Sequence, residues 1–238
     1  MFSLLIRRDG LIDPPPMGER DAHCHILPGI DDGPKDDHGA LAIARLLCEM
    51  GVRKVVATPH VISDVYPNST AKISAAVDAL RRLFSASGLG IEVEAGAEYY
   101  AEGELLDRIE HRDLLAFGEE KYVLFESPVE RRPMVLEDIA FSLASAGYTP
   151  LLAHVERYEF LRKDPDAVAR LREIGVRFQV NHPSFHLPKT SGRGEMARSL
   201  YVKGLVDVLG TDMHRATPWD RPSRSAELLA HPRSRLGR

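Results

Sequence analysis

Short apolar runs alternate with helix-length segments along most of this chain, and this alternation constrains the fold more than any other feature of the sequence. Parallel strands need long crossover connections, and the usual crossover is a helix. The apolar runs predict seven strands, at 20–23, 54–58, 91–95, 122–125, 149–153, 177–180 and 206–210. The pattern therefore predicts an α/β fold, a distorted (β/α)7 TIM-like barrel in a single domain.

Helices are expected between these strands, and the clearest lie at 37–51, 71–88, 131–147 and 164–175. Each segment ends at a glycine, which favours the backbone conformation of a helix C-terminus. Asp164 is placed to cap the last helix, with Pro165 in its first turn. Residues 1–18 carry a Pro-Pro-Pro break and no periodicity, so we expect a poorly ordered arm before a folded domain over 19–238.

Composition excludes several classes of partner. The 31 basic and 35 acidic residues give a net charge of -4, which predicts no attraction to nucleic acid or to membranes. The N-terminal apolar run is too short for a signal peptide, and no run approaches the length of a membrane span. With only two cysteines, Cys24 and Cys48, no disulfide framework is expected. We expect a cytoplasmic protein without membrane insertion, and the oligomeric state stays open.

Side chains that can bind metals follow every predicted strand except the sixth, which is followed by Asn181. In β/α barrels the functional residues stand at the C-terminal ends of the strands, where the loops converge on one face. The candidates are His23, His25, His60, Glu98, Glu126, His154, Asp212 and His214, with Asp31 or Asp32 from the loop after the first strand. We therefore expect a metal centre at this face.

The first strand ends in His-Cys-His, and residues two apart on a strand point to the same side. His23 and His25 are expected to hold one ion together, while Cys24 points away. The candidates exceed what one ion accepts, so two or three divalent ions are implied. Imidazole and carboxylate without thiolate suit Mn²⁺, Fe²⁺ or Zn²⁺. Such a centre lowers the pKa of bound water and most naturally serves phosphoester hydrolysis.

A phosphate ester also needs a cationic group, and arginine offers a planar fork of donors. Arg157 lies in AHVERY after the fifth strand, and Arg221 lies in DMHRATPWDRPS after the seventh. Both are candidates for phosphate binding, and an ordinary surface position is the alternative for each. His182 and His186, after the sixth strand, either line the site or face solvent.

The stretches DAHCHILPGIDDGPKD, TPH, GAEYY, AHVERY and GTDMH together resemble the polymerase and histidinol phosphatase (PHP) superfamily. Within it, the chain is similar to the bacterial metal-dependent protein-tyrosine phosphatases of capsular and exopolysaccharide operons. The resemblance covers about Asp21 to Pro222, and the HxHxLPGxDDG element is specific to that group. It implies a PHP-type phosphatase domain over 19–238.

The resemblance implies a centre of three ions, with Mn²⁺ as the first choice and Fe²⁺ or Zn²⁺ as alternatives. It places His23, His25, Glu98 and Asp212 at one ion, Glu98, Glu126 and His154 at a second, and Asp32, His60 and His214 at a third. Asp32 is preferred because the second aspartate of the element is the family's ligand, although the residues alone leave Asp31 open. Arg157 and Arg221 match the family's phosphate-binding arginines.

The activity that the resemblance implies is hydrolysis of phosphotyrosine by attack of a metal-bridging hydroxide, without a phosphoenzyme. The implied substrate is a phosphotyrosine-bearing protein, the cognate bacterial tyrosine kinase that controls polysaccharide synthesis. The chain departs from the family in its N-terminal arm and in the loop NHPSFHLPKTSGRG after the sixth strand.

Three other functions remain to be weighed. A small-molecule phosphomonoesterase such as histidinol phosphatase shares the metal cluster, but the DDGPK loop and the short chain argue against it. A metal-dependent amidohydrolase normally adds a lysine after a middle strand, where this chain has Glu98 and Glu126. A non-catalytic binding module would have broken ligands. A thiolate phosphatase is excluded because the position six residues after Cys24 is Ile30, not arginine.

Overall fold

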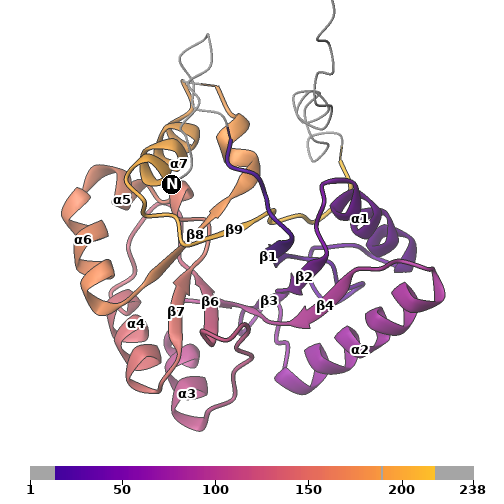
Figure 1. The fold of residues 1–238 in the computed structure, drawn as a ribbon. Coiled ribbons are helices and arrows are strands. Elements are labelled where there is room, and N and C mark those ends of the chain that lie inside the picture. The colour runs from indigo at the N-terminus through magenta and orange to yellow at the C-terminus, as the bar shows by residue number, and fades with distance from the viewer. Residues whose placement is uncertain (1–13, 189, 218–238) are drawn as a thin grey trace, which may run out of the picture.

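The structure is a computed structural model that describes residues 14–188 and 190–217 (Figure 1). The strands are β1 (Arg20–Cys24), β2 (Lys54–Ala57), β3 (His60–Val61), β4 (Glu92–Ala95), β5 (Glu98–Tyr100), β6 (Tyr122–Glu126), β7 (Thr149–Leu152), β8 (Arg177–Asn181) and β9 (Val208–Gly210). The α-helices are α1 (Asp37–Glu49), α2 (Thr70–Ala86), α3 (Gly103–His111), α4 (Leu136–Ser145), α5 (Glu159–Lys163), α6 (Pro165–Ile174) and α7 (Gly192–Val202). The 3-10 helices are η1 (Val155–Arg157) and η2 (His182–His186).

The strands form a curled sheet in which every pair of neighbours is parallel. Their order is β1-β2-β4 in one part and β3-β5-β6-β7-β8-β9 in the other. After β9 the chain returns to β1, because the Asp212 amide donates to His23 O at 2.8 Å and the His25 amide donates to Met213 O at 3.0 Å. The expected α/β fold with parallel strands is therefore confirmed.

All seven strands expected from the sequence are present, with small shifts at their ends. The sequence did not predict β3 and β5, which continue β2 and β4 after breaks at Pro59 and Gly96. A proline lacks the amide hydrogen that a sheet needs, and a glycine weakens a strand, so the breaks at Pro59 and Gly96 hid the short strands that follow them. These two short strands carry His60 and Glu98.

The helix predicted over 131–147 was wrong at its start, because α4 begins only at Leu136. Pro133 disfavours a helical conformation at the residue before it, which delays the helix. The predicted cap of α6 is confirmed, since the Asp164 side chain accepts hydrogen bonds from two amides of the first turn. That helix ends at Gly175, whose φ of 97° lies in the left-handed region.

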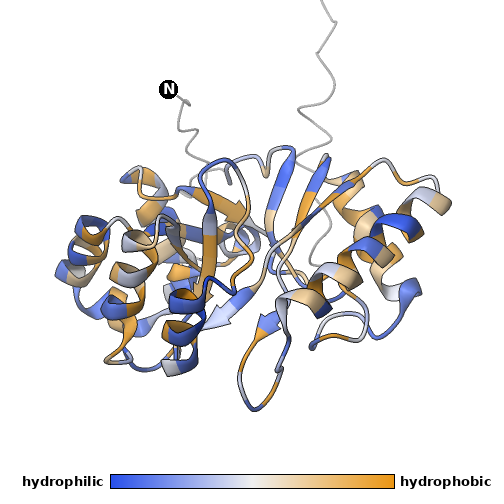
Figure 2. Ribbon diagram, turned by 90° about the horizontal axis from the view of Figure 1, so that it is seen from below, coloured by the Kyte–Doolittle hydropathy of each residue, from blue (hydrophilic) through white to orange (hydrophobic). Residues whose placement is uncertain are grey.

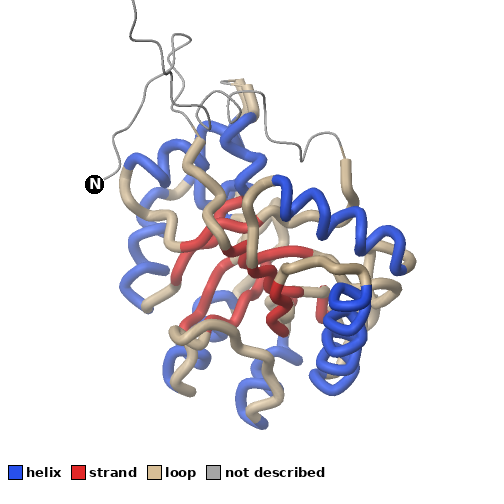
Figure 3. The backbone as a smooth tube through the Cα atoms, turned by 45° about the vertical axis from the view of Figure 1, so that its right-hand side comes forward, coloured by secondary structure: helices blue, strands red, loops and turns tan. Residues whose placement is uncertain are grey.

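The helices surround the strands on the outside (Figure 3), and they carry both hydrophobic and hydrophilic residues around their axes (Figure 2). A large apolar core fills the space between helices and sheet. A smaller cluster packs inside the curl of the sheet and consists of Ala22, Val56, Phe117, Leu124, Leu151 and Ala153. Hydrophobic side chains thus fill part of the interior, and the polar strand ends lie beyond them.

The first described residues already pack against the domain. Met17 is only 7% exposed and belongs to the core, and the Pro15 carbonyl accepts a hydrogen bond from His182 at 3.0 Å. The packed chain thus begins before Glu19, within the arm expected at 1–18, and residues 1–13 of that arm lie outside the described residues. None of the helices in the described ranges is long and apolar enough to cross a bilayer.

Candidate metal centre

The histidines and carboxylates expected at the strand ends come together in the structure. Their nitrogen and oxygen atoms form groups within 4.8 Å of one another, each able to hold a cation. The groups are His25, Asp32, His60 and His214; His23, His25 and Asp212; and His60, Glu98 and Glu126. His154 joins them, because its Nε2 lies 3.0 Å from Glu98 Oε1. Every strand-end candidate therefore belongs to one continuous cluster.

Glu98 lies at the centre of the cluster and is fully buried. Its Oε2 lies 3.3 Å from His23 Nε2, 3.2 Å from His25 Nε2 and 3.1 Å from His60 Nδ1. Neither oxygen is aligned for a hydrogen bond with any described residue. A buried carboxylate without hydrogen bonds is costly unless a cation neutralises it. This set of carboxylate oxygens without hydrogen-bond partners and imidazole ring nitrogens therefore fits divalent metal ions.

The charges in the cluster point the same way. Burial would lower the pKa of His23, but the carboxylates of Glu98 and Asp212 raise it to about 9. Burial would raise the pKa of Asp212, but the positive charge on His23 holds it far below its usual range. The buried carboxylates thus favour positive charge in this site, and bound divalent ions would supply that charge directly.

Local backbone irregularities aim these side chains. The pairing of β1 with β2 shifts register between Asp21 and Cys24, and such bulges re-aim side chains next to functional sites. His154 and Asp212 both have positive φ, at 30° and 55°. This conformation is strained for residues with a side chain and persists only where the surroundings enforce it. Two of the candidate ligands therefore sit on strained turns at strand ends.

The two aspartates of the DDG element have different surroundings. Asp32 Oδ1 lies 3.2 Å from His214 Nε2 and 3.7 Å from His60 Nε2, inside one of the cation-sized groups. Asp31 Oδ2 instead lies 2.7 Å from His25 Nδ1 and accepts the His60 amide at 3.0 Å. Asp31 thus orients His25 from behind, a role that the sequence did not distinguish from metal binding.

Cys24 is fully buried in the outer core, and its thiol lies 3.5 Å from Met213 O. Burial raises the pKa of the thiol well above its ordinary range. A nucleophilic cysteine needs an accessible thiolate. The prediction that Cys24 points away from its two histidine neighbours agrees with this position.

Arg157 reaches the cluster, with Nη1 3.3 Å from Asp212 Oδ2 and its side chain 33% exposed. Arg221, the other expected phosphate-binding residue, lies outside the described residues. His182 is not in the groups that could hold an ion; it bonds Pro15 and its ring lies 5.3 Å from His186.

Sequence reasoning missed several polar and aromatic neighbours of the cluster. Gln179 and Asn181, on β8, contact three of the candidate ligands. The strand FQVN alternates apolar and polar residues, and this alternation was the signal that could have found them. Tyr66 stacks on His60 with ring centroids 5.7 Å apart. Tyr99 is buried in the core, and its hydroxyl accepts a hydrogen bond from the Leu115 amide.

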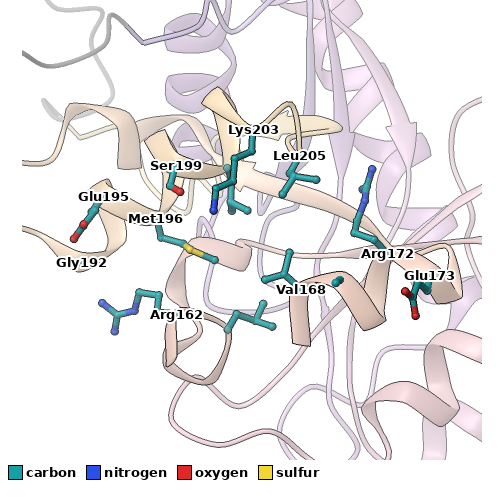
Figure 4. Close-up of a pocket in the computed structure, with 13 residues that line it drawn as sticks. Arg162, Val168, Arg172, Glu173, Gly192, Glu195, Met196, Ser199, Lys203 and Leu205 are labelled. Atoms are coloured by element: carbon teal, nitrogen blue, oxygen red, sulfur yellow. The ribbon is translucent and has the colours of Figure 1, made fainter. Parts of the chain in front are cut away.

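A separate groove of about 630 Å³ lies between α5, α6 and α7 (Figure 4). It is lined by apolar side chains such as Met196 and Val168, with Arg162, Lys203 and Glu195 among its polar residues. Its lining contains no histidine and shares no residue with the strand-end cluster. The cluster, rather than this groove, is the candidate functional site.

Comparison with known proteins identifies the family. A family model for capsular polysaccharide synthesis, CpsB/CapC, matches residues 20–230. The chain is 33% identical to tyrosine-protein phosphatase YwqE of Bacillus subtilis over 196 residues, 82% of this chain and 76% of that protein. It is 27% identical to tyrosine-protein phosphatase CpsB of Streptococcus pneumoniae over 201 residues, 82% of each chain.

A solved structure agrees with these sequence matches. It comes from work on YwqE of Bacillus subtilis and CpsB of Streptococcus pneumoniae, described there as metal-dependent tyrosine phosphatases. The TM-score is 0.79 at 29% identity, and the match covers 89% of this chain and 85% of that one. The family model spans the whole of the strand-end cluster, and with a relative 33% identical over 82% of this chain it shows that the chain belongs to the CpsB/CapC family of capsular polysaccharide synthesis proteins.

Proposed function

We propose that this chain is a metal-dependent protein-tyrosine phosphatase that hydrolyses phosphotyrosine. The observation that carries the proposal is the buried Glu98, whose two oxygens lie among histidine ring nitrogens without a hydrogen bond to any described residue. Relatives that cover most of the chain are named tyrosine-protein phosphatases. A cluster of this composition suits phosphoester hydrolysis.

The proposed ligands fall into three overlapping sets. One ion would lie between His23, His25, Glu98 and Asp212, whose facing atoms are 3.2 to 3.5 Å apart. The other two sets are Glu98, Glu126 and His154, and Asp32, His60 and His214. His60 borders both, with Nε2 toward Asp32 and Nδ1 3.0 Å from Glu126.

Two or three divalent ions are proposed, Mn²⁺ in the first place and Fe²⁺ or Zn²⁺ as alternatives. Bound there, they would activate water and neutralise the charge of the phosphate group. The chain itself supplies orientation and further charge. Arg157, whose Nη1 lies 3.3 Å from Asp212 Oδ2, is proposed to donate to phosphate oxygens at the edge of the cluster. Arg221 is proposed for the same task from the sequence alone.

A phosphotyrosine also presents an aromatic ring and a good leaving group. Tyr66 is partly exposed and stacks on His60. Its ring offers an apolar surface beside the cluster on which a phenyl ring can pack. The phenolate leaving group needs little protonation, so the proposal requires no dedicated acid.

The proposed substrate is the cognate bacterial tyrosine kinase that regulates capsular or exopolysaccharide synthesis, which places the reaction in the cytoplasm. We propose further that the sheet is a distorted (β/α)7 barrel. The hydrogen bonds between β1 and the segment after β9 support closure. The proposal includes no nucleic-acid partner, consistent with the net charge of -4.

Comparison of two substrates tests the function. We expect the metal-loaded protein to hydrolyse a phosphotyrosyl peptide with a higher kcat/KM than histidinol phosphate. Arg157→Gln should lower kcat/KM about 10²-fold, in line with loss of one charge-stabilising donor. Arg53→Gln is the matched control, since Arg53 is exposed and precedes the N-terminal end of β2, whereas the cluster lies at the C-terminal ends of the strands. A clear preference for histidinol phosphate would favour the small-molecule phosphomonoesterase instead.

A further inference from the structure

β8 contributes no candidate metal ligand, yet two amide side chains at its end point into the cluster. We propose that Gln179 and Asn181 are positioning residues, which fix the ring orientation and proton placement of His23, the turn at His154 and the carboxylate of Asp212. This inference rests on the proposed function, because it concerns ligands of the proposed metal centre. It goes beyond that function because neither amide is a ligand or an expected phosphate-binding group.

Both side chains face the interior because of the alternation along the strand. Phe178 and Val180 pack into the outer core, so the residues between and after them face the opposite side. Gln179 is fully buried and Asn181 is 8% exposed. Buried amides normally have their hydrogen bonds satisfied, and the partners here are the candidate ligands.

The orientation of each amide follows from one main-chain bond. The His154 amide can only donate, and it lies 2.7 Å from Gln179 Oε1, which must therefore accept. Gln179 Nε2 is then a donor, and it lies 2.9 Å from Asn181 Oδ1. Asn181 Nδ2 in turn donates to Asp212 Oδ2 at 2.7 Å. A single directed chain of hydrogen bonds thus links three strand ends.

The same series of hydrogen bonds determines which ring nitrogen of His23 carries the proton. Its Nδ1 lies 3.0 Å from Gln179 Oε1, and an oxygen that only accepts requires a hydrogen on that nitrogen. In the neutral ring, Nε2 then carries the free lone pair. Nε2 faces Glu98 Oε2 at 3.3 Å and Asp212 Oδ1 at 3.5 Å. Gln179 therefore holds His23 in the tautomer that can bind a metal ion.

Asp212 is oriented in the same way. Its Oδ2 accepts from Asn181, and Arg157 Nη1 lies 3.3 Å from the same oxygen. Its Oδ1 is left facing the His23 and His25 rings, each 3.5 Å away. Because the Asp212 backbone has a positive φ, these side-chain bonds help to hold a conformation that the residue disfavours.

Asn181 is itself anchored from behind. Its main-chain N–H donates to Glu156 Oε1 at 3.2 Å, and the Ser184 hydroxyl donates to the same oxygen at 2.7 Å. Glu156 is fully buried, and burial raises the pKa of its carboxyl. The loops after β7 and β8 are thus tied to the end of the amide chain.

The two histidines of the first strand differ in the partner of their outer nitrogen. His25 Nδ1 faces the carboxylate of Asp31, whereas His23 Nδ1 faces the neutral amide of Gln179. A carboxylate partner makes an imidazole more basic than an amide does. A neutral partner also adds no further negative charge to a buried cluster already rich in carboxylates.

The test uses Zn²⁺ as a diamagnetic probe on protein stripped of metal, with Gln179→Leu, Gln179→Glu and Val180→Ala. We expect Gln179→Leu to weaken Zn²⁺ binding in titration calorimetry by about 10- to 100-fold. In nitrogen-detected NMR of the zinc-loaded wild type, the His23 Nδ1 proton should exchange slowly with water because Gln179 accepts it, and this Nδ1 signature of slow exchange should be lost in Gln179→Leu.

Gln179→Glu keeps an acceptor for His23 and a similar volume, so it should retain Zn²⁺ and the Nδ1 proton. It loses the donor to Asn181 and adds a negative charge, which should move the pH profile of turnover to higher pH. Val180→Ala, on the opposite face of β8, should lower the melting temperature but change Zn²⁺ affinity less than twofold.

The outcomes separate the two proposals. If the wild type binds no Zn²⁺, the metal centre and this inference both fail. If the wild type binds Zn²⁺ and Gln179→Leu binds it equally well with the Nδ1 signature intact, only the inference fails. Equal loss of Zn²⁺ affinity in Gln179→Leu and Val180→Ala would show that the amides contribute only general packing, and this result would also overturn the inference.

Discussion

Replacement of Gly210 by alanine is a sharp test of how the strand ends pack. A Cβ at this position would lie 2.5 Å from His23 Cβ, 2.9 Å from Gln179 Nε2 and 3.0 Å from the His23 amide nitrogen. Real Cβ atoms essentially never come this close to other atoms, and the His23 atoms are on or next to the main chain. The ends of β1 and β9 must therefore move apart, or His23 must shift.

The expected cost follows from overpacking a buried site. Inserting one methyl group into a filled interior costs about 1–3 kcal/mol. For a chain of this length each kcal/mol shifts the melting temperature by about 2–4 °C, so Gly210→Ala should lower it by about 2–12 °C. Because His23 is displaced, turnover should fall further than stability suggests, by about 10²-fold for a shift near 1 Å.

Thermal unfolding and phosphotyrosyl peptide turnover measure the two effects. Gly90→Ala is the matched control, because a Cβ there meets nothing within 4 Å and φ is not in the left-handed region. That variant should be neutral or stabilised by up to about 1 kcal/mol. Wild-type stability and turnover in Gly210→Ala would refute the close approach of Gly210 to His23.

Three further predictions address single residues. Cys24→Ser should keep phosphotyrosine turnover, with a modest loss of thermal stability because the new hydroxyl is buried. Loss of all turnover would show instead that the thiol takes part in catalysis. His25→Ala and Asp212→Ala should each abolish turnover, and activity retained in both would contradict the cluster assignment. Burial and the neighbouring His186 lower the pKa of His182 to about 4. Its neutral form therefore stabilises the fold above pH 6.5, and up to about 3 kcal/mol is lost as pH falls from 6.5 through 4. Acid unfolding should be shallower in His182→Gln and unchanged in the control His38→Gln, which alters an exposed residue; equal pH dependence in wild type and His182→Gln would count against this.

The fold was largely predictable because the apolar period and the glycines at helix ends are local signals. β8 and α6 illustrate this, since their residues alone indicate strand and capped helix. β3 and β5 were not predictable, because each is too short for a period and follows a break at Pro59 or Gly96. The closing contact between Met213 and His25 joins segments far apart in sequence, which no local pattern encodes.

Residue type and position at strand ends were enough to find the cluster around Glu98. They were not enough to distinguish Asp31 from Asp32 as a metal ligand, because only the folded loop shows which carboxylate faces Nδ1 of His25. Gln179 and Asn181 escaped because a search for metal ligands passes over amides. Contacts of this kind depend on side chains from three strands meeting in space, and a single strand does not reveal them.

The metal content of the purified protein, measured together with turnover, tests the central claim most directly. We predict two or three divalent ions per chain, loss of phosphotyrosyl peptide hydrolysis after chelation, and recovery on addition of Mn²⁺. Such binding should also raise the melting temperature, since an ion at 100 times its dissociation constant adds about 2.7 kcal/mol. Full turnover by a protein shown to be free of divalent ions would contradict the account.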